Sequence, residues 1–208
     1  MKRSILFGTA VAAAMALTSV STADVIFNNF GEGDTYQTGT GWTLSDGAPL
    51  GNDTDQGDAF TVVGGSYFLD QIDVAIGLVT GINRIFLDLY DDAGGQPGSV
   101  LDSAVIDGQM GQFGGANAPI VALFSGGTLL VEGVQYWVIA STDVDTWAAW
   151  NLNSTNDIGP HAIRQNMGAW GISDNTRGAF RVIGTLPAPG ALALFGLAGL
   201  GARRRRRA

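Results

Sequence analysis

The segment Phe68-Leu69-Asp70-Gln71-Ile72-Asp73-Val74-Ala75-Ile76 decides the fold class. Ile72, Val74 and Ile76 alternate with polar or smaller neighbours, and a period of two sends one face of a strand into a core. No central segment has the length and the 3.6-residue apolar spacing of a helix. The pattern therefore predicts an all-β domain.

Similar short apolar runs recur on both sides of this segment, separated by turn residues such as Gly64-Gly65 and Gly126-Gly127. About ten short strands with turns every 8–12 residues are typical of a sandwich or jelly roll. No internal repeat suggests the blades of a propeller. We predict one two-sheet antiparallel β-sandwich, jelly-roll-like, over residues 24–185, with strands at 25–30, 59–63, 68–76, 84–90, 99–106, 120–124, 128–131, 136–141, 146–151 and 179–183.

Composition limits the chemistry and the partners of the central domain. The chain has no cysteine, which excludes disulfides, thiolate metal sites and cysteine nucleophiles. The central domain holds all 19 acidic residues but only four basic ones, a net charge of −15 with histidine neutral. So acidic a domain is repelled by nucleic acid and by anionic glycans. Neutral polysaccharide, cations or another protein stay open as partners.

The N-terminus has the three parts of a signal peptide over residues 1–23. Lys2 and Arg3 are followed by an apolar helical run at 5–17 and by small residues that end at Ala23. We expect signal peptidase to cleave between Ala23 and Asp24. The alternative is a permanent transmembrane anchor, but a run of about a dozen residues is short of the roughly 20 that a spanning helix needs.

The C-terminus reverses this order. Two prolines in Leu186-Pro187-Ala188-Pro189-Gly190 end the preceding strand, and an uncharged apolar run follows at 191–202. As a helix this run is about 20 Å long, against a hydrocarbon core of about 30 Å. It is followed by a cluster that positive charge keeps on the cytoplasmic side: Arg203, Arg204, Arg205, Arg206 and Arg207. The alternative, a disordered basic arm that binds nucleic acid, does not explain the apolar run.

A proline motif, a short apolar helix and a terminal arginine cluster resemble the PEP-CTERM sorting signal over residues 186–208. The resemblance implies processing by an exosortase-type enzyme in Gram-negative bacteria that make extracellular polysaccharide. Pro187-Ala188-Pro189 stands where the family has Pro-Glu-Pro. A sortase motif would read Leu-Pro-x-Thr-Gly, and Pro189 occupies the threonine position.

Several motifs of the central domain occur in a familiar order. They are Val25-Ile26-Phe27-Asn28-Asn29-Phe30-Gly31, Gly39-Thr40-Gly41-Trp42, Leu89-Tyr90-Asp91, Gly95-Gln96-Pro97-Gly98, Trp147-Ala148-Ala149-Trp150-Asn151 and Gly178-Ala179-Phe180-Arg181-Val182. Together they resemble the bacterial choice-of-anchor domains, most closely type R. These are extracellular β domains with varied C-terminal anchors, and the resemblance implies no enzymatic activity.

Two sets of residues are candidate ligand sites. Asp53, Asp55 and Asp58 are the candidate ligands for Ca²⁺, which prefers carboxylate oxygens, although the segment 52–58 lacks the EF-hand order and a solvated acidic turn fits it better. Trp147 and Trp150 are candidates for stacking on neutral sugars. Their odd spacing puts them on opposite faces of one strand, so one of them is expected in the core, as is Trp137.

The sequence contains no recognisable catalytic motif. His161 is the only histidine, no Gly-x-Ser-x-Gly motif accompanies it, and we expect it in a surface loop beside Pro160. Glycosidases need two opposed carboxylates, and the two glutamates, Glu32 and Glu132, are not in a paired motif.

The sequence therefore predicts a non-catalytic surface or matrix protein associated with exopolysaccharide or biofilm. Its expected location is the envelope or the extracellular space, after transient anchoring of the C-terminal helix in the inner membrane. The alternatives are a carbohydrate-binding module, with or without Ca²⁺, and a secreted glycan hydrolase.

Overall fold

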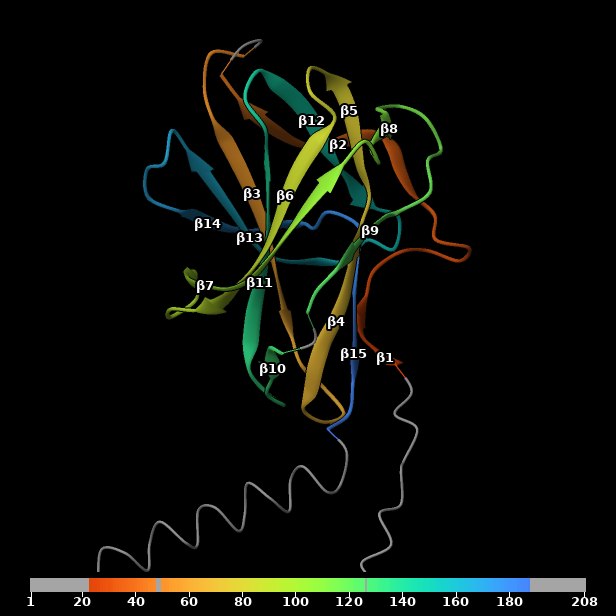
Figure 1. Ribbon diagram of the computed structural model, residues 1–208, viewed down its shortest axis with the longest axis vertical. Coiled ribbons are helices and arrows are strands. Elements are labelled where there is room, and N and C mark those ends of the chain that lie inside the picture. Colours follow the sequence, from red (N-terminus) through yellow and green to blue (C-terminus); the bar gives the residue numbers. More distant parts are fainter. Residues whose placement is uncertain (1–22, 48–49, 126, 188–208) are drawn as a thin grey trace, which may run out of the picture.

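The computed structural model describes residues 23–47, 50–125 and 127–187, and all regular elements in these residues are β-strands (Figure 1). The all-β prediction and the prediction of two sheets are confirmed. The helices expected at the two ends lie outside the described residues.

The smaller sheet is antiparallel throughout. Its path runs from β1 (Ala23–Asn28) through β15 (Phe180–Thr185) to β4 (Tyr67–Val74). Both β9 (Ile120–Leu123) and β10 (Leu129–Leu130) pair with β4.

The larger sheet runs in the order β7-β6-β11-β3-β2-β12-β5-β8. Its strands are β7 (Pro97–Asp107), β6 (Arg84–Asp92), β11 (Gln135–Thr142), β3 (Thr54–Thr61), β2 (Tyr36–Asp46), β12 (Thr146–Asn153), β5 (Ile76–Thr80) and β8 (Gly111–Gln112). A branch leaves it where β13 (Ile158–Gln165) pairs with β3 and carries β14 (Gly171–Thr176). Within the described chain, β5 and β8 form the single parallel pair.

The segment 68–76 joins the two sheets rather than forming one strand. It is divided at Ala75, so that β4 belongs to the smaller sheet and β5 to the larger one. The Ala75 amide donates to Ala179 O at 3.0 Å, and Ala75 O accepts from the Asn151 amide at 2.8 Å. Ala75 therefore holds the two sheets together at this crossing.

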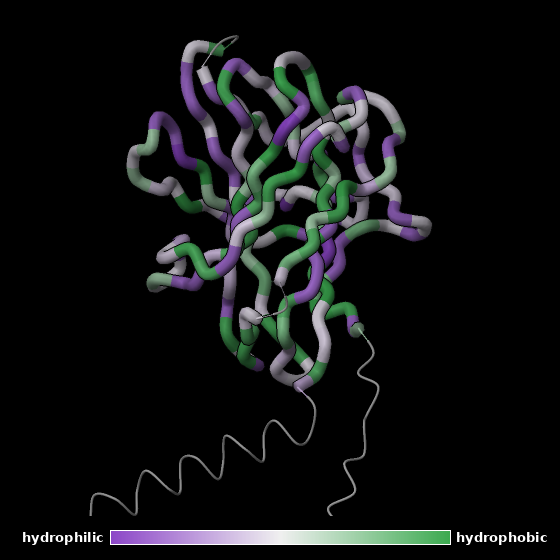
Figure 2. The backbone as a smooth tube through the Cα atoms, viewed as in Figure 1, coloured by the Kyte–Doolittle hydropathy of each residue, from purple (hydrophilic) through white to green (hydrophobic). Residues whose placement is uncertain are grey.

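The main core lies between the sheets and contains apolar residues from both. Its largest fully buried side chains include Phe60, Leu69, Leu87, Trp150 and Phe180. The aromatic rings of Phe60, Trp150 and Phe180 meet edge to face at centroid distances of 5.9 and 6.3 Å. In Figure 2, hydrophobic stretches follow the strands, and several loops far from the chain ends are hydrophilic.

The two ends of the described chain lie side by side. Ala23 pairs with Thr185 and Asp24 pairs with Gly184, so the chain enters and leaves the domain at the same end (Figure 1). Cleavage between Ala23 and Asp24 would remove the first residue of β1 and leave its remaining five residues in the sheet.

Candidate functional site

A hollow lies on the face of the larger sheet that is turned away from the core. Ala149 of β12 is flanked across the sheet by Thr43 of β2 and Gly77 of β5. Trp147 lies two residues further along β12, about 7 Å away on the same face. The hollow has a volume of about 320 Å³, and its lining carries no charged side chain: Gly39, Thr40, Gly41, Thr43, Val79, Phe113, Trp147 and Ala149.

Phe113 lines the hollow because hydrogen bonds to strands β5 and β2 hold the segment after β8 in place. Its amide donates to Leu78 O of β5 at 2.9 Å, and the next amide, of Gly114, donates to Thr38 O of β2 at 3.1 Å. A Cβ atom at Gly77 would lie 2.8 Å from Phe113 Cα. A glycine at position 77 therefore allows Phe113 to pack directly on the sheet.

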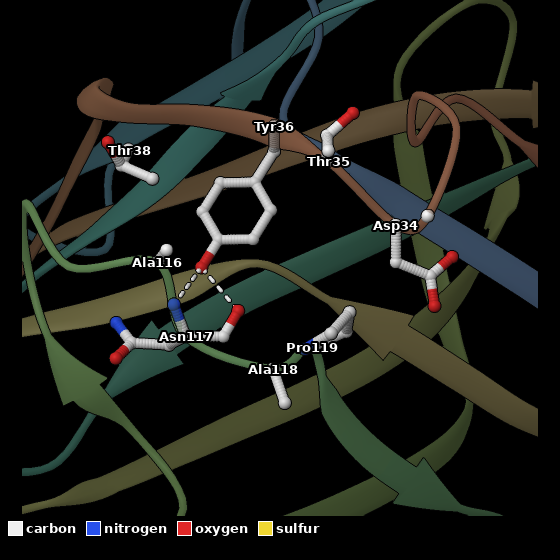
Figure 3. A pocket seen from close by; sticks show the side chains of 9 residues that line it. Asp34, Thr35, Tyr36, Thr38, Ala116, Asn117, Ala118 and Pro119 are labelled. Atoms are coloured by element: carbon white, nitrogen blue, oxygen red, sulfur yellow. Dashed lines mark hydrogen bonds between the residues drawn. The ribbon is translucent and has the colours of Figure 1, made fainter.

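A second hollow, of about 430 Å³, lies where residues 33–38 face residues 116–119. Figure 3 shows Tyr36 reaching across to Asn117. The Tyr36 hydroxyl donates to Asn117 O at 2.8 Å and accepts from the Asn117 amide at 3.0 Å. Asp34 is the charged residue of this lining, and Arg181 Nη1 donates to it at 2.8 Å. Its polar groups are thus largely used within the protein.

The two candidate tryptophans lie on opposite faces of β12, as their spacing predicts. Trp147 is half-buried at the hollow, whereas Trp150 is fully buried in the core. Trp150 Nε1 donates to Ala179 O at 3.0 Å. Trp150 is therefore not a ligand-binding residue, which corrects that part of the sequence interpretation. Trp137 is fully buried, as expected.

The prediction that His161 lies in a surface loop is wrong. It is buried in β13, and the Trp42 ring stacks on it at 4.3 Å between centroids. Its Nδ1 lies 2.9 Å from Asp58 Oδ1, and its Nε2 lies 3.0 Å from Gln56 Oε1. Gln56 Nε2 donates to Thr43 O, which fixes Oε1 toward the histidine.

Oxygen atoms face both ring nitrogens of His161, so each nitrogen has a hydrogen-bond partner within the protein. A polar side chain can be buried at low cost only when it has such partners. Burial raises the pKa of Asp58, and the hydrogen bond from His161 opposes that shift.

The three candidate calcium ligands do not share a site. Asp58 is fully buried and binds His161 and the Gly178 amide. Asp55 forms an ion pair with Arg164 at 2.6 Å, and Asp53 accepts from the Gly47 amide at 3.0 Å. Among the described residues, no group of three or more His, Asp or Glu side chains is arranged to hold a metal ion.

The free energy of unfolding is expected to fall as pH rises. Four carboxyl groups have a pKa raised above 3.8, and burial is the largest cause in each case: Asp46, Asp55, Asp58 and Asp88. Such groups stabilise the fold most below their unfolded pKa and lose that contribution as pH rises through the folded pKa. Asp92 acts in the opposite sense. Burial raises its pKa, but hydrogen bonds led by that from Trp137 lower it below 3.8 overall, so its contribution is lost only in stronger acid.

We therefore expect a higher melting temperature at pH 4 than at pH 8. Thermal melts of the full chain between pH 3 and pH 9 check this, with Asp88→Asn expected to flatten the decline. A melting temperature that climbs steadily from pH 4 to pH 8 would contradict it.

Sequence reasoning did not identify Phe113 or the glycines of β2 as site residues. The signal that was present is Gly77 inside an apolar run, since an isolated glycine in a strand often marks a close backbone approach.

Of the sorting motif, Leu186 is exposed and Pro187 half-buried, while residues 188–208 lie outside the described residues. Ala23 and Asp24 lie at the start of β1.

Comparisons with known proteins add no family to this geometry. A scan against protein-family models found no match, and a search of the curated proteins found none either. The part of the chain that the structure describes contains no helix long and apolar enough to cross a membrane.

Proposed function

We propose that the chain is an exported, non-catalytic protein of the cell envelope or extracellular matrix, associated with exopolysaccharide or biofilm. On this proposal, signal peptidase cleaves between Ala23 and Asp24. An exosortase-like enzyme handles the PEP-CTERM-like tail at 186–208, whose apolar helix anchors the protein transiently in the inner membrane. The two sheets follow a jelly-roll-like arrangement.

The pairing of the two chain ends supports this proposal most. Ala23 lies opposite Thr185, so the signal segment and the tail join the domain at one end. Both segments can therefore meet the same membrane while the whole domain lies on one side of it. The opposite end, with the loop between β11 and β12, then faces away from the membrane (Figure 1).

The described residues also support a non-catalytic role. The single histidine of the chain, His161, is buried. Its Nδ1 is hydrogen-bonded to Asp58, and its Nε2 is hydrogen-bonded to Gln56. A general base must reach a substrate proton, and this imidazole is buried with both nitrogens occupied by partners within the protein.

Replacing the five arginines at 203–207 by serine tests the proposed sorting. We expect most of the domain to move from the envelope fraction to the culture medium, because positive charge retains the tail on the cytoplasmic side. The matched lysine replacement keeps the charge and is expected to stay in the envelope. An unchanged distribution of the serine variant between fractions would contradict the proposal.

Carbohydrate binding is the second candidate function, and one observation favours it over a hydrolase. Trp147 lies at an uncharged hollow on an outer sheet face, and no carboxylate is part of that lining, whereas glycoside hydrolysis needs two.

A further inference from the structure

We infer that the hollow between Trp147 and Phe113 binds an uncharged saccharide chain, an inference that rests on the second candidate function and defines its ligand and residues. The occupant must be a molecule with C–H faces for the aromatic rings and hydroxyl groups for the polar groups of strand β2.

The aromatic side chains supply the first part of the recognition. Trp147 and Phe113 are both half-buried, so each has ring surface in contact with solvent as well as with the protein. They come from β12 and from the segment after β8, and the small residues between them leave room for a ligand. Aromatic rings of this kind contribute large apolar contact areas at little cost in side-chain entropy.

Strand β2 supplies the second part. Gly39 leaves its backbone open, Gly41 packs closely on the backbone of Trp150, and Thr40 and Thr43 belong to the same lining. A Cβ atom at Gly39 would meet no other atom within 4 Å. Threonine hydroxyls donate and accept hydrogen bonds, as sugar hydroxyls do. The hollow thus combines apolar rings with a few polar groups, the usual make-up of a ligand site.

Charge decides the class of saccharide. None of the eight lining residues is charged, so the hollow has no cation for a uronate, sulfate or phosphate group. The domain around it has a net charge of −15, which repels anionic polymers. A volume of about 320 Å³ lies at the small end of ligand pockets, so the hollow holds a short stretch of the chain.

Calorimetric titration of the full chain in mild detergent tests the inference. The probes are cellohexaose and mannohexaose, both uncharged, and hexagalacturonate as the anionic counterpart. We expect at least one neutral probe to bind and hexagalacturonate not to bind.

Substitutions at two positions locate the site. Trp147→Ala is expected to weaken binding at least tenfold, with Trp147→Phe retaining part of the affinity. Gly39→Leu leaves both rings in place and adds a bulky side chain to the lining, where a Cβ atom meets no other atom within 4 Å, and it is expected to weaken binding to a similar extent. Trp170→Ala is the matched control, because Trp170 lies elsewhere, under the Arg164 guanidinium at 4.5 Å, and its loss should leave binding unchanged.

The outcomes are distinct from those of the sorting test. Binding of neither neutral probe overturns the inference, as does equal binding of hexagalacturonate or full binding by a folded Trp147→Ala variant. Thermal melts establish that each variant is folded. None of these results depends on where the cell delivers the protein, so failure here leaves the proposed export standing.

Discussion

Trp150→Ala is expected to lower the free energy of unfolding by about 3–5 kcal/mol, the range for removing a large aromatic side chain from a core. Trp150 is fully buried, and its ring meets Phe180 at 5.9 Å. The substitution leaves a cavity between the sheets. It also removes the donor to Ala179 O, at the point where Ala75 passes from one sheet to the other.

Backbone packing around Trp150 limits how far that cavity can close. A Cβ atom at Gly178 would overlap the indole, with Trp150 Cδ1 at 2.6 Å. The indole therefore lies directly on the backbone of residue 178, which is held by the hydrogen bond from its amide to Asp58. Because this backbone is fixed, we expect little collapse, and the cost should lie in the upper part of the range.

Urea unfolding monitored by circular dichroism measures the effect. Trp147→Ala is the matched control, since it removes the same side chain from the outer face of the same strand, and we expect it to cost about 1 kcal/mol or less. Equal destabilisation by the two variants would contradict the assignment of Trp150 to the core and of Trp147 to the surface.

Asp58→Ala is expected to cost about 3–5 kcal/mol, because removing one partner of a buried pair leaves the other without compensation. Three neighbours would be affected. His161 would lose its partner at Nδ1, the Gly178 amide would lose its acceptor at 2.7 Å, and Trp42 would stack on a ring no longer held on one side.

A double-mutant cycle with His161→Ala measures the coupling. If the two side chains stabilise each other, the loss of stability in the double variant should be smaller than the sum of the two single losses by about 0.5–3 kcal/mol. Asp174→Ala, at an exposed position on β14, is the control and should change stability by about 0.5 kcal/mol or less. Additive effects in the cycle would show that the buried pair does not act as a unit.

Alternating apolar residues predicted the fold class, because the period of a strand depends only on neighbouring residues. Alternation at 68–76 indicated strands, but it did not show the crossing at Ala75, which depends on hydrogen bonds to Asn151 and Ala179 that are distant in sequence. Asp73 was expected on the polar face, yet it is buried because Arg181 pairs with it at 2.6 Å. Long-range pairing thus altered what period-two spacing implied.

The strands that the sequence did not reveal have identifiable causes. Strand β2 carries glycines at 39 and 41 among threonines, and this composition is typical of a loop. Strand β13 contains Pro160, a residue that argues against the interior of a strand. The next residue, His161, is polar and suggests an exposed position, but hydrogen bonds to Asp58 and Gln56 allow it to be buried.

The candidate site was predictable in part. The odd spacing of Trp147 and Trp150 predicted opposite faces, and β12 shows which of them is outside. Phe113 was not predictable, because it reaches the hollow through hydrogen bonds to β5 and β2 that no local pattern encodes. The aspartates at 53, 55 and 58 looked like one cluster, but each binds a different partner.

We propose above all that the domain is exported through its N-terminal signal, with its two ends joined to the membrane-directed segments on one side. Mass spectrometry of the native protein, recovered from each cell fraction, tests this most directly. We predict a mature N-terminus at Asp24 in the envelope or the medium. A cytoplasmic protein that begins at Met1 and retains its five terminal arginines would contradict the claim.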